Sequence, residues 1–365
     1  MPTYASGLSG QVGAVAESTY GTAVTVTHFY EFLSENFQFV PAWLDGMGLK
    51  AGQAYNRASR TVVSQFDVNG DLTMEHTSGE AANAVADSMG FWWKYALGST
   101  LTTPTLVLGT AYKQVHTNGS KAGQFMTVQV GRPQISGVTV QPFTYTGVKV
   151  TDWEFSCNDN QIAQLKVTCD GRNESTATGL AAASYPTPNG LFSFANASIM
   201  TIGGTASTSA GETTIAGGST LGSLVNGVDI ISSTPMKVDR YGLGNAGLKG
   251  EPIENAIPTI TGTLTTEFFS RTELYDVFKG FGTTPMQIDF TKFDPAGNDA
   301  NGVASGPNPY RLSFIFPSVR FKTAAVNINS PDVLPQSIGF QAYDDGSGTN
   351  PVIQVKLVSK ESSSI

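Results

Sequence analysis

Strict alternation of apolar and polar side chains is the feature of this sequence that most narrows its fold. Residues 65–75 alternate throughout and place four apolar side chains on one face: Phe66, Val68, Leu72 and Met74. A period of two is typical of a β-strand with one face in a core. The same pattern recurs over residues 153–157, 164–169 and 259–268. We therefore predict a mainly β fold.

One of these strands has a close match elsewhere in the chain. Residues 68–75 (VNGDLTME) align with residues 260–267 (ITGTLTTE) at a constant offset of 192 residues. Residues 161–171 likewise resemble residues 336–346, with Gln at the start and Asp-Gly at the end of both. Matched segments in the same order indicate an internal duplication. We expect two tandem copies of one β-sandwich or β-barrel.

Each matched strand is followed by a helix-start signal. Residues 77–80 (TSGE) and 270–273 (SRTE) have the Ser/Thr-x-x-Glu spacing of a capping box, whose side chains satisfy free backbone N–H groups at a helix start. We expect a short helix after each box, packed on its sheet. The apolar side chains of the first helix would be Ala81, Ala82, Val85 and Met89. Those of the second would be Leu274, Val277 and Phe278, before a stop at Gly280.

Shifts in composition suggest where the copies meet. A run rich in Ala, Ser, Thr and Pro predicts a linker, and the Gly/Ser/Thr-rich residues 203–222 predict a long loop. The expected organisation is an N-terminal arm over residues 1–27, a first β domain over 28–172, a linker over 173–189 and a second β domain over 190–365.

The charge balance limits the partners this chain can have. Only 14% of its residues are charged, against about 25% in ordinary soluble domains, and its net charge is −8. Lys and Arg form no cluster that would neutralise phosphates, so we expect no grip on nucleic acid. A surface poor in charge suits a protein that is covered by copies of itself. A secreted β-sandwich shares this composition and is the alternative.

The two cysteines bear on the compartment in which the chain folds. Cys157 and Cys169 fall in one predicted hairpin, where Cys157 would oppose a residue near Ile162 and Cys169 one near Val150. They would be too far apart to bond. Free thiols, with no basic and apolar leader at the N-terminus, favour folding in a cytoplasm. No apolar run reaches about 18 residues, so we expect no membrane span.

None of the candidate catalytic, cofactor or metal sites has the sequence pattern that its chemistry requires. Asp67, Asp71 and Glu75 share a strand face, but the second copy has Thr at the first two places, which favours a solvated face over a catalytic set. Residues 242–247 match G-x-G-x-x-G without the flanking strand and helix that a dinucleotide site requires. The three histidines lack metal-ligand spacing, and residues 294–302 lack the Glu that ends a calcium loop. We expect no enzyme, no cofactor and no metal.

The N-terminal region resembles a known family. Residues 10–24, which contain G-x-x-x-E-x-x-Y-G-T, are followed by residues 28–35 and are similar to the start of siphophage tail tube proteins, also called major tail proteins. Residues 145–155 and the ending 339–358 resemble the same family. The resemblance implies two tail-tube-like β domains whose subunits close into rings. Rings would stack into a hollow tail tube that delivers DNA into the host, and DNA would pass without specific binding.

The resemblance also implies partners and a place. The chain would bind itself, a tape-measure protein, a tail terminator and baseplate proteins, in a virion tail assembled in the host cytoplasm. Three chains per ring with pseudo-six-fold symmetry are favoured, and six chains are the alternative. We expect residues 42–59 and 235–256 to contact the next ring. Another tail or capsid component, such as a baseplate hub or decoration protein, and an extracellular carbohydrate-binding β-sandwich are the other hypotheses.

The polar strand faces are the candidate walls of the channel. A tube wall needs an apolar face for its core and a polar face for the lumen. The residues predicted to face the lumen are Asp67, Asp71, Glu75, Thr263, Thr265 and Glu267.

Overall fold

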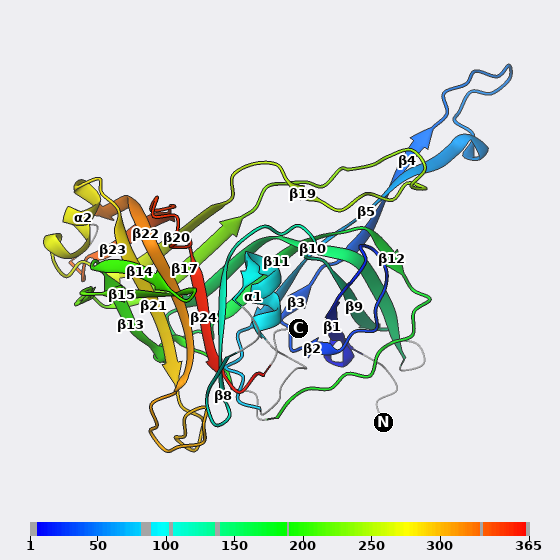
Figure 1. Ribbon diagram of the computed structural model, residues 1–365. Helices are drawn as coiled ribbons and strands as arrows, with labels where there is room; N and C mark the ends of the chain where they lie inside the picture. Colours follow the sequence, from blue (N-terminus) through cyan, green and yellow to red (C-terminus); the bar gives the residue numbers. More distant parts are fainter. Residues whose placement is uncertain are drawn as a thin grey trace.

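The protein is a β-sandwich whose strands form two layers around one hydrophobic core (Figure 1). The computed structural model describes residues 6–81, 89–101, 105–135, 139–187, 190–328 and 331–362, with only the backbone of Ser198 and Ile199. The mainly β prediction is confirmed. The described ladders form no closed series in which the last strand pairs with the first. The fold is therefore an open sandwich and not a barrel.

The described residues of the first half form twelve strands. They are β1 (Gln11–Ala16), β2 (His28–Tyr30), β3 (Ser34–Glu35), β4 (Gln38–Asp45), β5 (Thr61–Glu75), β6 (Gly98–Thr100), β7 (Thr105–Leu108), β8 (Ala111–Asn118), β9 (Met126–Pro133), β10 (Val140–Asn158), β11 (Gln164–Gly171) and β12 (Asn173–Ser175).

The second half supplies another twelve. They are β13 (Ala197–Ile202), β14 (Thr205–Ser209), β15 (Glu212–Ala216), β16 (Ser219–Thr220), β17 (Val225–Ser233), β18 (Met236–Lys237), β19 (Ile253–Glu254), β20 (Thr259–Glu267), β21 (Thr284–Lys292), β22 (Tyr310–Val326), β23 (Pro335–Ala342) and β24 (Gln354–Ser359).

One layer is a single antiparallel sheet that runs through both halves. Its strand order is β4, β5, β11, β10, β17, β20, β23 and β22, and we call it the long sheet. The long strands β10 and β22 enter it with their C-terminal parts. Their N-terminal parts belong to the second layer, where β10 pairs with β9 and β22 pairs with β21 and β24.

The two halves pair their strands in the same order. The order β1, β9, β10, β11, β5, β4 in the first half is matched by β13, β21, β22, β23, β20, β17 in the second. Each long strand also carries a β-bulge where it changes partners, between Val150 and Asp152 and between Phe321 and Thr323. These parallels fit the predicted duplication, which itself stays a prediction.

The ladders correct the register of one sequence match. Leu72 pairs with Val167, and Leu264 pairs with Ile338, so Val167 and Ile338 are counterparts. The alignment of residues 161–171 with residues 336–346 instead matches Val167 with Ala342, which lies four residues further along. Gln and Asp-Gly recur near strand ends in many sheets, because they suit turns, and so they fixed a wrong register.

Only the second helix begins at its predicted capping box. Residues 77–81 are non-helical, residues 82–88 lie outside the described part, and α1 spans Met89–Leu97. Glu80 forms an ion pair with Lys292 at 2.7 Å and is not a cap. In the second half, η5 (Arg271–Tyr275) and α2 (Asp276–Lys279) follow Ser270, whose side chain makes no capping bond. That helix ends before Gly280, as predicted. The remaining one-turn helices are η1 (Gly7–Ser9), η2 (Ala58–Arg60) and η4 (Phe194–Asn196).

Segments expected to be irregular are partly ordered by pairing. Within the predicted N-terminal arm, β1 is inserted between β2 and β9. The predicted linker starts with β12, which pairs with β10, and the predicted loop over residues 203–222 contains the β14–β15 hairpin. Two ladders, β10 with β17 and β8 with β24, join the halves into one body. The division into domains stays a prediction.

The cysteine hairpin is close to the predicted one. Cys169 pairs with Val150 as expected, and both thiols are free and buried. Burial is the main cause that raises the pKa of Cys157 to about 11, which keeps this thiol protonated and unreactive.

The N-terminal motif has a clear structural role. The buried carboxylate of Glu17 accepts hydrogen bonds from the backbone N–H of Gly21 (2.8 Å), that of Gly147 (2.9 Å) and the hydroxyl of Thr127 (2.7 Å). Gly21 has a φ of +76°, and a Cβ there would lie 2.5 Å from the Arg172 side chain. The motif thus fastens β1 to the turn inside β10, which explains its spacing.

Replacing Glu17 by Ala should lower the free energy of unfolding by about 3 kcal/mol, because three buried donors lose their acceptor. Urea denaturation of the variant and the wild type measures this loss. Glu31→Ala, at an exposed position, is the matched control and should change little. Equal stability of both variants would contradict the fastening role.

Candidate channel face and assembly edges

One face of the long sheet is polar along its whole width. A single cross-strand row joins Glu75, Gln164, Ser156, Asp229, Thr263, Gly339 and Thr323. The positions between this row point into the core, where Trp153, Phe155 and Leu264 are at most 1% exposed. The alternation in the sequence therefore produced one continuous surface, which spans both halves.

Acidic side chains predominate on this face. By register it carries Asp71, Glu75, Asp152, Glu154, Asp229 and Glu267, against Lys166 and Arg320, with Lys322 exposed in the adjoining bulge of β22. Asp67, Asp170 and Lys149 also lie on this side of the sheet by register. Lys166 lies 3.4 Å from Asp71 in a half-exposed ion pair, and such a pair contributes little to stability. Asp71, Glu75 and Glu267 are among the residues predicted from the sequence, whereas Asp152, Glu154 and Asp229 are not. Alternation with Trp153 and Ile230 was the signal that could have found them.

Asp67 differs from the other predicted lumen residues in having a buried cation as its partner, although its side chain stays 36% exposed. Its carboxylate forms an ion pair with the ammonium group of Lys249, whose side chain is fully buried. Lys249 also contacts Asp170 at 2.5 Å. Burial raises the pKa of Asp170 to about 6, against the opposing effect of Lys249. Asp71, Glu75, Thr263, Thr265 and Glu267 stay partly or fully exposed on the face.

Lys249 belongs to a segment that crosses the sheet, residues 234–258, which we call the strap (Figure 1). The strap lies over β5, β10 and β11. Its Glu251 pairs with the buried Lys149 at 2.5 Å, and its Gly247 carbonyl accepts a hydrogen bond from the N–H of Phe66 at 2.9 Å. These contacts hold the strap on its own chain. The G-x-G-x-x-G sequence lies within it, so a dinucleotide site has no support here.

Two edges of the long sheet are left without a partner strand. At one end, the described part of the chain pairs β4 only with β5. At the other end, β22 pairs with β23 over residues 319–326, while its opposite edge has no described ladder beyond Val319. Unpaired edges bind other strands unless they are blocked.

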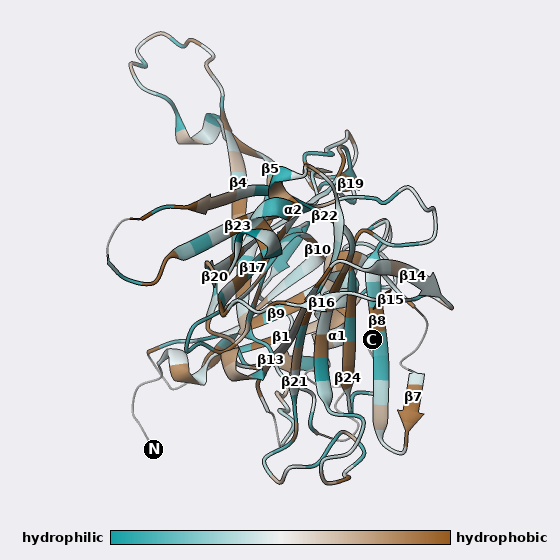
Figure 2. Ribbon diagram, turned by 90° about the vertical axis from the view of Figure 1, so that its left-hand side faces the viewer, coloured by the Kyte–Doolittle hydropathy of each residue, from teal (hydrophilic) through white to brown (hydrophobic). Residues whose placement is uncertain are grey.

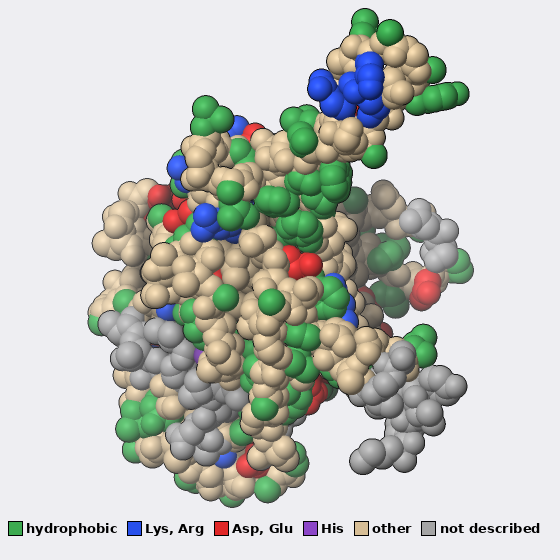
Figure 3. All heavy atoms as spheres, turned by 90° about the vertical axis from the view of Figure 1, so that its right-hand side faces the viewer, with side chains coloured by type: hydrophobic (Ala, Val, Ile, Leu, Met, Phe, Trp, Pro, Cys, Tyr) green, Lys and Arg blue, Asp and Glu red, His purple; other side chains and the backbone are tan. Residues whose placement is uncertain are grey.

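The hairpin of β4 and β5 forms a projection from the body, residues 41–66, which we call the arm (Figures 1 and 2). Its tip carries apolar side chains that are largely exposed, among them Met47 at 77% and Tyr55 at 90%. Three basic residues, Lys50, Arg57 and Arg60, lie close to them (Figure 3). An exposed patch of this kind marks an interaction surface.

The histidines and the acidic turn have structural roles. His76 accepts a hydrogen bond from the Trp93 indole at 3.0 Å, and burial lowers its pKa to about 4. Burial likewise lowers the pKa of His116 to about 3. In the acidic turn, Asp294 and Asp299 accept hydrogen bonds from nearby backbone N–H groups. No group of three possible metal ligands occurs among the described residues.

Among the described residues, the polar sheet face therefore ends in two edges without a partner strand. The sequence matches the family described as phage tail tube protein over residues 7–342, which is nearly the whole chain. The chain belongs to this phage tail tube protein family. It is a structural protein of the virion tail, and the family implies self-assembly into a tube and contacts with other tail proteins.

Two further findings complete the comparison. A search among curated proteins gives no match. In the described part of the chain, no helix is long and apolar enough to cross a membrane.

Replacing Lys249 by Met should lower the free energy of unfolding by about 3–5 kcal/mol, because Asp67 and Asp170 would be left without their cation. Hydrogen exchange should show faster exchange at Phe66, and urea denaturation measures the loss. The control Lys237→Met removes an exposed cation of the same strap and should change neither reading. Unchanged exchange in Lys249→Met would show that the strap is held by other contacts.

Proposed function

We propose that copies of this chain close into rings, that the rings stack into a hollow tube, and that DNA passes through the tube into the host. The observation that carries the proposal is the long sheet, with one continuous polar face and two open edges. An edge that is paired around a ring is protected from aggregation. Among the alternatives left open by the sequence, the family assignment favours the tail tube.

The junction inside the chain serves as a template for the junction between chains. Within one chain, β17 of the second half pairs with β10 of the first half. The strand order makes β4 the counterpart of β17, and β22 the counterpart of β10. We infer that β4 of one chain pairs with the C-terminal part of β22 in the next chain. Asp152 pairs with Ser233 in the template, which places Val40 opposite Thr323 between chains.

Repeating this junction alternates the two halves around a ring, and the six positions per ring are those that the family resemblance implies. If each chain supplies two similar units, junctions within and between chains alternate around a closed ring. Three chains then make a ring with pseudo-six-fold symmetry. The proposed partners of its ends and interior are a tail terminator, baseplate proteins and a tape-measure protein.

Cryo-electron microscopy of assembled tubes should show three chains per ring, with the two halves of each chain alternating around the wall. This outcome follows because both halves offer the same strand order at their edges. Six chains per ring, with one half of each chain outside the wall, would contradict the arrangement.

The polar face would form the channel wall. Its excess of carboxylates repels phosphates, and this repulsion extends over about 8 Å at physiological salt. DNA near the wall would therefore slide without being held. No cluster of Lys or Arg interrupts the described face, which supports passage without specific binding.

Replacing Glu75, Asp229 and Glu267 together by Lys should leave assembly intact, because no apolar contact is lost. The rate of DNA ejection should fall about tenfold at low salt and recover as salt rises, because phosphates bind the new cations. The control combines Glu75→Gln, Asp229→Asn and Glu267→Gln and should eject DNA at a nearly normal rate. Normal ejection by the Lys variant would contradict the lumen assignment.

A further inference from the structure

The arm and the strap are counterparts in the two halves. The arm connects β4 to β5, and the strap connects β17 to β20, which hold the same places in the strand order. Phe39 pairs with Val68 before the arm, and Ser232 pairs with Ile260 before the strap. The arm spans residues 41–66 and the strap residues 234–258, so the two connections are nearly equal in length. One lies on the protein body, and the other projects away from it (Figure 1).

The strap has a defined seat on the first half. It contacts the start of β5 at Phe66 and Asp67, and the end of β11 at Asp170. Gly247 packs so closely that a Cβ there would lie 3.3 Å from the Phe66 ring. The seat is therefore formed by the start of one strand and the end of its neighbour, at the junction between the halves.

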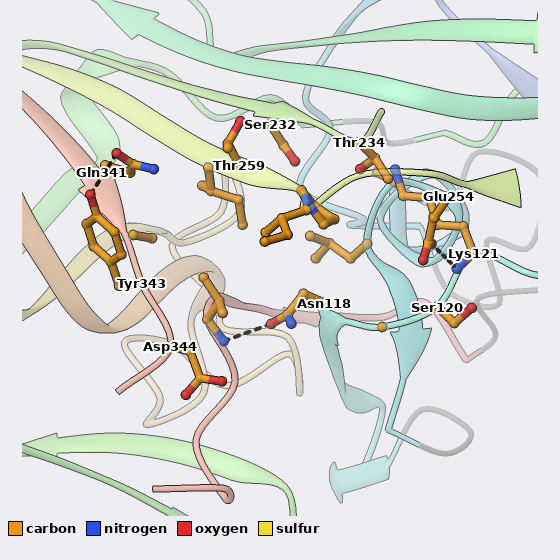
Figure 4. Close-up of a pocket in the computed structure, with 18 residues that line it drawn as sticks. Asn118, Ser120, Lys121, Ser232, Thr234, Glu254, Thr259, Gln341, Tyr343 and Asp344 are labelled. Atoms are coloured by element: carbon orange, nitrogen blue, oxygen red, sulfur yellow. Dashed lines mark hydrogen bonds between the residues drawn. The ribbon is translucent and has the colours of Figure 1, made fainter. Parts of the chain in front are cut away.

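The same place in the second half is a groove of about 570 Å³ (Figure 4). The ladder register makes Thr259 the counterpart of Asp67, and Gln341 the counterpart of Asp170. Both residues line the groove, together with Tyr343. Nothing in the described chain fills this seat, whereas the equivalent seat in the first half holds the strap.

The chemistry of the groove suits the arm. The groove has an apolar lining that includes Leu97, Ile257, Ile260 and Val352. Its charged lining residues are Glu254, Asp344 and Lys121, and the Glu254 carboxylate accepts a hydrogen bond from the Lys121 backbone N–H. The apolar lining is therefore the part of the groove that matches the arm. The arm tip combines exposed apolar side chains with Lys50, Arg57 and Arg60. Asp45 is the one acidic residue between positions 42 and 60, so this tip is basic in a chain of net charge −8.

We propose that the arm of one chain occupies this groove in a second copy of the chain, its neighbour in the same ring. The inference rests on the proposed ring, because the β4–β22 junction is what brings the arm over the neighbour's second half. The arm would then clasp its neighbour as the strap clasps the first half. Pro258 stands in the place of Phe66 and has no N–H group, so the arm is held there by apolar side-chain contacts.

Crosslinking between chains that each carry one introduced cysteine tests the docking directly. Chains with Tyr55→Cys are mixed with chains with Ile257→Cys, assembled, and treated with a short bis-maleimide. Because each chain carries one new thiol and the native thiols are buried, a dimer band reports a contact between chains. Isolated rings should give a strong dimer band. The matched control, Tyr55→Cys mixed with Ser207→Cys on the exposed β14–β15 hairpin, should give little.

The stage of assembly at which the crosslink forms shows whether the arm binds a neighbour in its own ring or a chain in the next ring. A crosslink in isolated rings supports docking within the ring, whereas a crosslink found only in stacked tubes would overturn it and place the arm against the next ring. No crosslink in rings that otherwise form normally would also overturn it. Failure to form rings at all would count against the proposed function instead.

A shortened arm gives a second reading. Replacing residues 46–57 by an Asn-Gly turn keeps the ladder of β4 with β5 and removes the tip. Docking within the ring predicts monomers in place of rings at concentrations where the wild-type chain assembles. Intact rings that fail to stack would contradict the proposal, and circular dichroism confirms that the shortened chain is folded.

Discussion

The unpaired backbone of β4 and of the C-terminal part of β22 is the constraint on which the rest of the structure depends. Hydrogen-bonding groups at a sheet edge must find partners or be shielded from them. Here the long sheet ends openly on both sides, and no described segment of the chain covers either edge. In the proposed ring, neighbouring copies of the chain pair with both edges, which would link the fold of one chain to a closed assembly.

The junction between the halves shows how such a partner can be held. The β10–β17 ladder supplies backbone hydrogen bonds, and the strap adds a buried charge cluster around Lys249. Removing charges from water is costly, so this cluster fixes the position of the strap more than it adds net stability. The proposed junction between chains uses the same two elements. A strand ladder joins the open edges, and the projecting arm fixes the position of the neighbouring chain.

The local alternation of side chains predicted the strands well. The helix start, the partner of Asp67 and the register between the halves depend on long-range contacts. Alternation located β5, β11 and β20, and it placed Cys169 opposite Val150. The helix start at Glu80 failed because Lys292, more than 200 residues away, takes its carboxylate. The ion pair of Asp67 with Lys249 of the strap was not predicted, because no local signal reveals it. The correspondence of strand registers between the two halves can be determined only from the ladders, because Asp-Gly pairs recur at many strand ends.

Disulfide mapping of the ring junction tests the central claim most directly. Rings assembled from chains with Val40→Cys and Thr323→Cys should form disulfides between chains upon oxidation, since the β10–β17 template places these positions opposite each other. A pair shifted by two residues, Val40→Cys with Ala325→Cys, should form few. Efficient bonding of the first pair and not of the second is the predicted result. No disulfide from either pair in well-formed rings would contradict closure through these edges.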